Sequence, residues 1–307
     1  MITYPYNYNN LRQIYKWYFT SYLRDYVRGL MISVFSAIID KYKRMDVKVF
    51  IENLGSKTLH IISILYEALF FTYQCLFKLL RQKSYNSATF DILIKQIYFT
   101  AVQALPILIF IGFVFGAVLI ALIVHLALDY GLKDHIGSLI ITLILNEFAP
   151  LITVLFVALR SGAAINTEIA VMKVSRELDT LQAFHIDIIE YLFLPRILAG
   201  MISLILLASL LSIIMLFSGY LYLLLFFETG LDLFIRTLMH AISIDDLILF
   251  FTKSLLFGFF VTLIPIYSGL NTVMAYTGIP IAVLNGMVKL IIAIMSIEVI
   301  LLLIQYL

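Results

Sequence analysis

Charged residues are scarce in this sequence of 307 residues: Asp, Glu, Lys and Arg make up 13% of it, whereas 63% of the residues are hydrophobic. A soluble globular domain carries about 25% charged residues, because its surface must face water. So few charges cannot cover a water-exposed surface, and lipid must therefore surround much of the chain. The formal net charge of +2 gives no indication of nucleic-acid binding.

Residues that carry catalysis or bind metals and nucleotides are also missing. Cys75 is the only cysteine, which excludes an intrachain disulfide and a cysteine-rich metal site. The five histidines show no metal-ligand spacing, and no G-x-x-x-x-G-K-[ST] loop is present to hold the phosphates of ATP. A G-x-S-x-G nucleophile motif is absent as well. The sequence therefore predicts neither an enzyme nor a bound cofactor.

Long apolar runs make up much of the sequence, and about 20 consecutive apolar residues are enough to cross a membrane. Turn and helix-breaking residues separate the last two runs: Pro265, Gly269, Asn271, Gly278 and Pro280. The predicted fold class is an all-α membrane protein with five transmembrane helices, at about 96–128, 136–159, 192–227, 247–268 and 279–305.

Residues 57–81 are predicted to form an apolar helix with one narrow polar stripe. If this helix crossed the membrane, Glu67 would lie near its centre, at a cost of about 2.5–3.5 kcal/mol. A helix in the interface keeps the stripe in water and buries its leucines in lipid. We favour the interfacial helix, with a sixth span as the alternative.

The distribution of Lys and Arg predicts the orientation. Thirteen of the 21 Lys and Arg residues precede Gln96, and basic residues concentrate on the cytoplasmic side of membrane proteins. The N-terminus and the 160–196 connection are therefore expected in the cytoplasm. Residues 1–50 form a basic, tyrosine-rich cytoplasmic extension, held at an anionic leaflet or bound to a soluble partner, ahead of a membrane domain over 51–307.

The connection at 163–184 is predicted to be a short amphipathic helix on the cytoplasmic side. Its apolar positions recur with helical spacing, and a polar set recurs on another face. The two sets are Val171, Val174, Leu178 and Leu181, and Lys173, Arg176, Glu177 and Thr180. Such a helix can lie on the membrane, dock in a groove on a partner or serve as a solvated linker.

Polar groups inside the predicted spans are candidates for function. Glu147 in the second span is expected to face the protein interior or an aqueous cavity, either as part of a binding site or as a bond between helices. Pro150 can kink this span and free a backbone carbonyl. Lys289 in the last span is a possible partner for Glu147. Glu298 is expected near the far membrane interface rather than buried.

Small residues in the first span permit close helix packing. They are Gly112, Gly116 and Ala117. The sequence allows these residues to pack against another helix of the same chain or across a homodimer seam.

Five short motifs follow one another from the second predicted span to the start of the third. They are Asn146-Glu147-Phe148-Ala149-Pro150, Arg160-Ser161-Gly162-Ala163-Ala164, Glu168-Ile169-Ala170-Val171-Met172, Glu177-Leu178-Asp179 and Pro195-Arg196-Ile197-Leu198-Ala199-Gly200. In this order and spacing, the chain from about residue 51 resembles the MlaE (YrbE) permeases, the membrane subunits of ABC transporters that move phospholipid with MCE proteins. It departs from the family pattern at Asn146, where arginine is common, and at Ala149 and Ala170, where glycine is common.

The resemblance implies an elbow helix, five spans and a cytoplasmic coupling helix that inserts into the ATPase subunit. The coupling residues that it implies are Glu168, Met172, Lys173, Arg176, Glu177 and Asp179. A lipid cavity is expected at Asn146, Glu147, Pro150 and Lys289.

The function implied by the resemblance is phospholipid movement between the inner and outer membranes, which maintains outer-membrane lipid asymmetry. The implied partners are a second copy of the chain, an ABC ATPase that binds ATP, a periplasmic MCE lipid-binding protein and phospholipid, at the bacterial inner membrane. An ion-coupled secondary carrier that uses Glu147 and a non-transporting membrane scaffold are the alternatives.

Overall fold

The computed structural model describes residues 33, 66–79, 87–227 and 231–306. The chain divides into two units, 1–67 and 68–307, and the elements below belong to the second. The N-terminal extension predicted over 1–50 lies outside the described residues except for Ser33, and so do 57–65 and 80–81 of the predicted interfacial helix. All regular structure in the described residues is helical.

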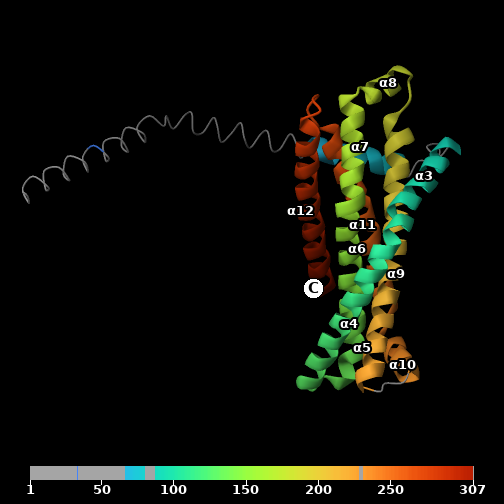
Figure 1. Ribbon diagram of the computed structural model, residues 1–307, viewed down its shortest axis with the longest axis vertical. Helices are drawn as coiled ribbons and strands as arrows, with labels where there is room; N and C mark the ends of the chain where they lie inside the picture. Colours follow the sequence, from blue (N-terminus) through green and yellow to red (C-terminus); the bar gives the residue numbers. More distant parts are fainter. Residues whose placement is uncertain (1–32, 34–65, 80–86, 228–230, 307) are drawn as a thin grey trace, which may run out of the picture. The chain divides into compact units, whose positions relative to one another are not determined.

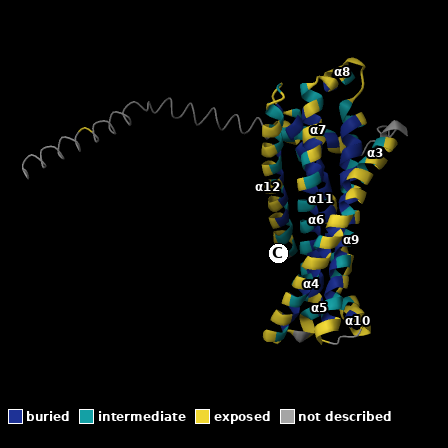
Figure 2. Ribbon diagram, in the orientation of Figure 1, coloured by how far each residue is buried: buried dark blue, intermediate teal, exposed yellow. Residues whose placement is uncertain are grey.

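Five helices of the described chain are long and apolar enough to cross a membrane, as the sequence predicts. They cover Phe90–Asp129, Ile136–Val174, Ile189–Phe227, Ile244–Leu270 and Gly278–Gln305. The protein is therefore a multi-pass membrane protein. Figure 2 shows buried residues on the inner faces of α9 and α11 and exposed residues along the outer faces of α4 and α12.

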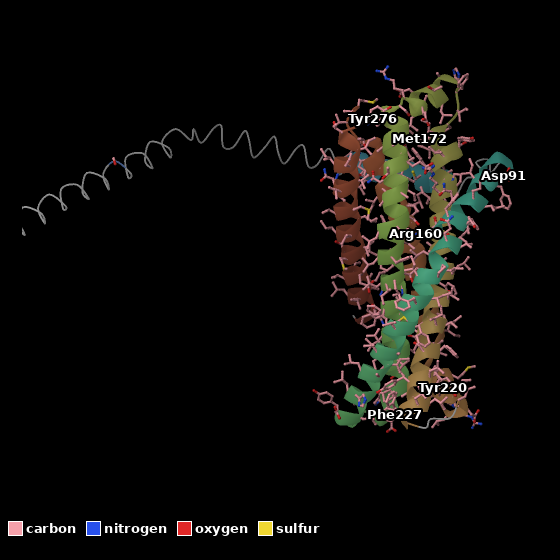
Figure 3. The ribbon with its side chains drawn as sticks, viewed as in Figure 1. Asp91, Arg160, Met172, Tyr220, Phe227 and Tyr276 are labelled. Carbon is pink, nitrogen blue, oxygen red and sulfur yellow. The ribbon has the colours of Figure 1, made fainter. Side chains whose placement is uncertain are left out.

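The first span is broken about a third of the way along its length. Helix α3 (Ser87–Thr100) passes through a short 3-10 turn, η2 (Val102–Ala104), into α4 (Leu105–Asp129). Pro106 lies in the first turn of α4, where its missing N–H does no harm. The carbonyl oxygen of Phe99 at the break accepts a hydrogen bond of 3.1 Å from Arg160 of the second span, which also donates to Gln103 at 3.0 Å. Figure 3 shows Arg160 beside this junction.

The second span is one continuous run of helical segments: α5 (Ile136–Ile140), η4 (Ile141–Phe148), α6 (Ala149–Val157), η5 (Ala158–Gly162) and α7 (Ala163–Val174). Both η4 and η5 are wider π-helical turns, which often occur at functional sites. The run extends well past residue 159, where the predicted span ends.

The prediction of one amphipathic helix over 163–184 is wrong. Helix α7 continues the second span, and a separate helix, α8 (Glu177–Ala183), follows it. The break is at Arg176, whose φ of 62° is left-handed and cannot continue a right-handed helix. Ser175 stabilises the break because its hydroxyl donates to the carboxylate of Glu177 at 3.0 Å. The apolar stripe inferred from the spacing is thus divided between two helices.

The remaining elements complete the bundle. After η6 (Ile189–Phe193) the chain continues into α9 (Leu194–Phe227), α10 (Leu231–Ala241), α11 (Ile244–Leu270) and α12 (Gly278–Tyr306). Helices α8 and α10 lie at opposite ends of the bundle (Figure 1). The turn predicted between the last two spans is present between α11 and α12.

Small residues allow the helices to approach within the chain. A Cβ atom on Gly112 would lie 2.6 Å from Leu211 of α9, and Gly116 faces the backbone of Met215 on the same helix. The small-residue face of the first span is therefore used for packing against α9 of the same chain.

Residues 66–79 are helical, and from residue 68 they belong to the second unit. The ring centroids of Phe71 and Phe193 are 6.0 Å apart, and those of Phe71 and Tyr267 are 5.6 Å apart. Lys78 forms an ion pair with Asp187, which follows α8. These contacts join the helix to the start of the third span and the end of the fourth.

Candidate functional site

Three charged side chains from three different helices meet inside the bundle. Lys253 of α11 donates to the carboxylate of Glu147 at 2.6 Å and lies 2.9 Å from a carboxylate oxygen of Glu298 on α12. The exposed fractions of the side chains are 1% for Lys253, 13% for Glu147 and 8% for Glu298. We call these three residues the buried charge cluster. Charged groups within apolar spans are costly and are therefore paired or functional.

A proline explains why the second span offers a further acceptor to this cluster. Pro150 has no N–H with which to bind the carbonyl oxygen of Asn146, four residues earlier. Lys253 instead donates to that carbonyl oxygen at 2.9 Å. The prediction that Pro150 leaves a backbone carbonyl for another partner at the level of Glu147 is thus confirmed.

Asn146 also connects the cluster to the first turn of α11. Its side-chain nitrogen donates to Asp246 at 2.6 Å, and Asn146 is fully buried. Asp246 accepts at the same time from the backbone N–H and the hydroxyl of Ser243, at 3.0 and 2.7 Å, and so completes the N-terminal cap of α11. A continuous set of polar contacts therefore runs from the end of the bundle near α10 to Lys253.

Two sequence predictions about charge pairing are wrong. Lys289 does not pair with Glu147 among the described residues; it lies on an exposed face of α12. Glu298 is buried and paired with Lys253 rather than placed at the interface. Pro150 lies in α6, where its side chain is buried.

Lys253 is the residue that the sequence reasoning missed. It lies within the predicted fourth span, but no role was inferred for it. A single lysine in an apolar span is itself a signal, because its ammonium needs an acidic partner in another span. The sequence contains two such carboxylates, at Glu147 and Glu298.

The six predicted coupling residues lie at the opposite end of the bundle, around the break between α7 and α8. Glu168 forms an ion pair with Arg196 of α9, which is 3% exposed. Lys173 donates to the carbonyl oxygen of Leu270 at the end of α11. Arg176, Glu177 and Asp179 are exposed. This segment is therefore attached to α9 and α11 and presents charged side chains outward.

A cavity of about 570 Å³ lies between α8, α3 and the start of α9. Glu168, Met172 and Glu177 line it together with Lys95 and Arg196. Figure 3 shows Met172 at this end of the molecule. Three of the six predicted coupling residues thus share one cavity, whereas Lys173 lies against α11.

Comparisons with known proteins agree with this architecture. Residues 93–304 match the model of a family described as permease MlaE. The chain is 28% identical over 218 residues to a probable ABC transporter permease protein of Rickettsia felis, which covers 71% of this chain and 82% of that protein. It is 28% identical over 238 residues to the intermembrane phospholipid transport system permease protein MlaE of Haemophilus influenzae, over 75% of this chain and 87% of that protein.

A more distant relative is found in a plant. Over 74 residues, the chain is 38% identical to the chloroplast protein TRIGALACTOSYLDIACYLGLYCEROL 1 of Arabidopsis thaliana. The match covers 24% of this chain and 21% of the plant protein.

Proposed function

The chain belongs to the MlaE permease family, and on that basis we propose that it is the membrane subunit of an ABC transporter that moves phospholipid between two membranes. The observation that carries the proposal is the family match over 93–304, which extends through nearly all of the five spans and includes every member of the buried charge cluster. The apolar outer faces of these spans suit the acyl chains of a lipid.

We propose further that two copies of the chain enclose the lipid path, and that a periplasmic MCE protein receives or delivers the lipid. Such a system would maintain the lipid asymmetry of an outer membrane. Our proposed orientation places the N-terminus and α8 in the cytoplasm and α10 on the far side, because basic residues concentrate before the first span. Asn146, Glu147 and Pro150 would then lie beside the lipid path on the far side.

The energy would come from ATP hydrolysis on a separate ATPase chain. We propose that this ATPase binds the α7–α8 segment, where Arg176, Glu177 and Asp179 are exposed. The attachment of Glu168 to Arg196 and of Lys173 to Leu270 would transmit its movement to α9 and α11.

Purification of the tagged chain from its native membrane tests the proposal. We expect an ABC ATPase to co-purify in fixed ratio, and mass spectrometry to detect bound phospholipid. Glu177→Arg should remove the ATPase without affecting expression. Asp232→Arg is the matched control, because Asp232 is also an exposed acidic residue and lies on α10 at the other end of the bundle.

Two results would contradict the proposal. Movement of solute by the purified chain alone under a pH gradient would favour an ion-coupled carrier. Repeated purification without an ATPase and without phospholipid would favour a scaffold.

A further inference from the structure

A buried arginine with unused hydrogen-bond donors lines the cavity of about 570 Å³ between α8, α3 and the start of α9. Arg196 is 3% exposed, and within the described chain its only ion pair joins the Nη2 atom to Glu168. Its Nε and Nη1 atoms are buried and have no hydrogen-bond partner among the described residues. A buried donor without an acceptor is costly, because it has lost its bonds to water. Arg196 therefore favours a ligand that brings acceptor oxygens into this cavity.

The charges around the cavity favour an anionic ligand. Lys95 of α3 also lines the cavity and takes part in none of the ion pairs between described residues. Of the two acidic residues that line it, Glu168 is paired with Arg196, and Glu177 accepts from the hydroxyl of Ser175 at 3.0 Å. A phosphate diester carries one negative charge and several acceptor oxygens, and arginine is well suited to bind it.

The cavity lies at the level of the membrane. Its residues from α3 fall within 92–99, which belong to the first span, and Arg196 belongs to the third. On α3 beside Lys95, the side chains of Phe90 and Ile94 are 61% and 51% exposed. Apolar side chains of this size are costly in water and suit contact with acyl chains. The ligand should therefore combine a phosphate with apolar chains, which is the chemistry of a phospholipid.

We propose that this cavity binds the phosphate of a phospholipid from the membrane leaflet next to α8. Arg196 and Lys95 hold the phosphate oxygens, and Phe99 and Leu181 of the cavity lining contact the glycerol and the first carbons of the acyl chains. The volume is within the range of about 300–1,000 Å³ that is typical of small-molecule sites. The site is at the opposite end of the bundle from the buried charge cluster, and it would hold lipid whether or not the chain transports lipid.

The test uses a photoreactive phosphatidylglycerol that carries a diazirine close to the glycerol on one acyl chain. The probe is added to nanodiscs of phosphatidylethanolamine and phosphatidylglycerol that contain the full transporter complex. After irradiation, mass spectrometry of peptides locates the adducts. We expect adducts on residues 92–99 and 180–191, which contribute to the cavity from two sides.

Substitutions of the two basic residues test whether the phosphate is recognised. The adduct is measured on 180–191, which carries none of the changes. Arg196→Gln should lower its yield by about tenfold, as expected for the loss of a charge-assisted hydrogen bond, and Lys95→Gln by about threefold, since Lys95 is exposed. The side chain of Glu168 is 51% exposed, so water can solvate it in Arg196→Gln. Arg236→Gln removes an exposed cation on α10 at the other end and should leave the yield unchanged.

A second measurement needs no substitution and so does not depend on the folding of a variant. A diacylglycerol with the same diazirine lacks only the phosphate and headgroup, and its adduct yield on 180–191 of the wild type should be about tenfold lower. Equal yields from the two probes would overturn the proposal. Loss of the phosphatidylglycerol adduct on addition of free glycerol phosphate would overturn it as well, because the site would then take a soluble anion.

Three further outcomes would overturn the proposed lipid site. They are the absence of adducts on 180–191 in the wild type, an unchanged yield in both folded variants, and an adduct that forms on the chain alone but not in the complex with the ATPase. The last would show that a side chain of the ATPase fills the cavity. Failure of the ATPase to co-purify would overturn the proposed function and leave this adduct in place, so the two proposals can fail separately.

Discussion

The side-chain ammonium of Lys253 donates a hydrogen bond of 2.9 Å to the backbone carbonyl oxygen of Asn146. This bond joins α11 to the π-helical turn of the second span, at the point where Pro150 provides no N–H. The same ammonium holds Glu147 and Glu298, so one side chain connects three spans.

Lys253→Met should therefore destabilise the protein strongly, because it leaves two carboxylates buried without their counter-charge. Removal of one partner of a buried ion pair costs about 3–5 kcal/mol. The free energy of unfolding can be measured by titration with a denaturing detergent. A variant that also carries Glu147→Gln and Glu298→Gln has no buried charge here and should regain most of the loss. Equal stability of Lys253→Met and wild type would contradict this account.

The five spans could be predicted from the sequence because the membrane imposes a simple condition, a long apolar run with few charges. The pairing of charges across spans could not, because it depends on how each helix is rotated about its axis. Lys289 and Lys253 both lie in apolar spans, but only Lys253 faces Glu147. The sequence predicts Glu298 near the membrane interface because it is close to the end of the last span. It is buried instead, since distance along the chain from the end of a span does not determine burial.

The α7–α8 segment shows a second limit of structure prediction from the sequence. Spacing alone identifies residues that would share a face if the helix were continuous. Arg176 has no intrinsic preference for the left-handed conformation that interrupts the helix, unlike glycine. The break could not be predicted from residue type. By contrast, the carbonyl freed by Pro150 was predictable, because the missing N–H is a covalent property of proline.

Close packing of α9 against α11 gives a second prediction. A Cβ atom on Gly258 would lie 2.6 Å from the Cα of Met201 and 2.8 Å from the carbonyl oxygen of Gly200. Because both atoms belong to the backbone, Gly258→Ala should force the helices apart at a cost of about 1–3 kcal/mol. The detergent-unfolding midpoint measures this loss. Gly278→Ala is the control, since its nearest neighbour would be 3.3 Å away, and an equal effect of both changes would refute the packing argument.

The ion pair between Lys78 and Asp187 predicts a pH dependence for the helix at 68–79. Burial raises the pKa of Asp187, but hydrogen bonds from Lys78 and from the backbone of Glu190 and Ile189, with the charge of Lys78, outweigh it and lower the pKa below its usual 3.8. Because the folded-state pKa is depressed, the contribution to stability is complete above about pH 4 and is lost as the pH falls below that value. The pair is partly exposed, so the loss is at most about 1 kcal/mol.

Hydrogen exchange of the 68–79 peptide, measured across this pH range, tests the dependence. Protection in the wild type should fall below about pH 4. In Asp187→Asn the protection should be lower at neutral pH and should change little on acidification. Asp232→Asn should behave as wild type, since Asp232 pairs with Arg236 on α10. A pH response that is identical in Asp187→Asn and wild type would exclude the ion pair as its source.

Cys75 provides a chemical probe of the same helix. Its side chain is fully buried, and burial raises the pKa of the thiol to about 12, although the charge of Lys78 opposes this shift. Since the thiolate is the reactive form, N-ethylmaleimide should modify Cys75 very slowly at pH 7 in the folded protein. Lys78→Ala weakens the attachment of the helix, and a loss of up to about 1 kcal/mol would raise the rate by about fivefold if labelling follows local opening.

The control places the thiol on the polar stripe of the same helix. Glu67 is exposed there, so a variant that combines Cys75→Ser with Glu67→Cys should react fast, and Lys78→Ala should change its rate little. Mass spectrometry of the intact protein follows both reactions. Equal rates for the two thiol positions would show that residues 68–79 do not pack against Phe193 and Tyr267 in the membrane, because burial by these contacts is what protects Cys75.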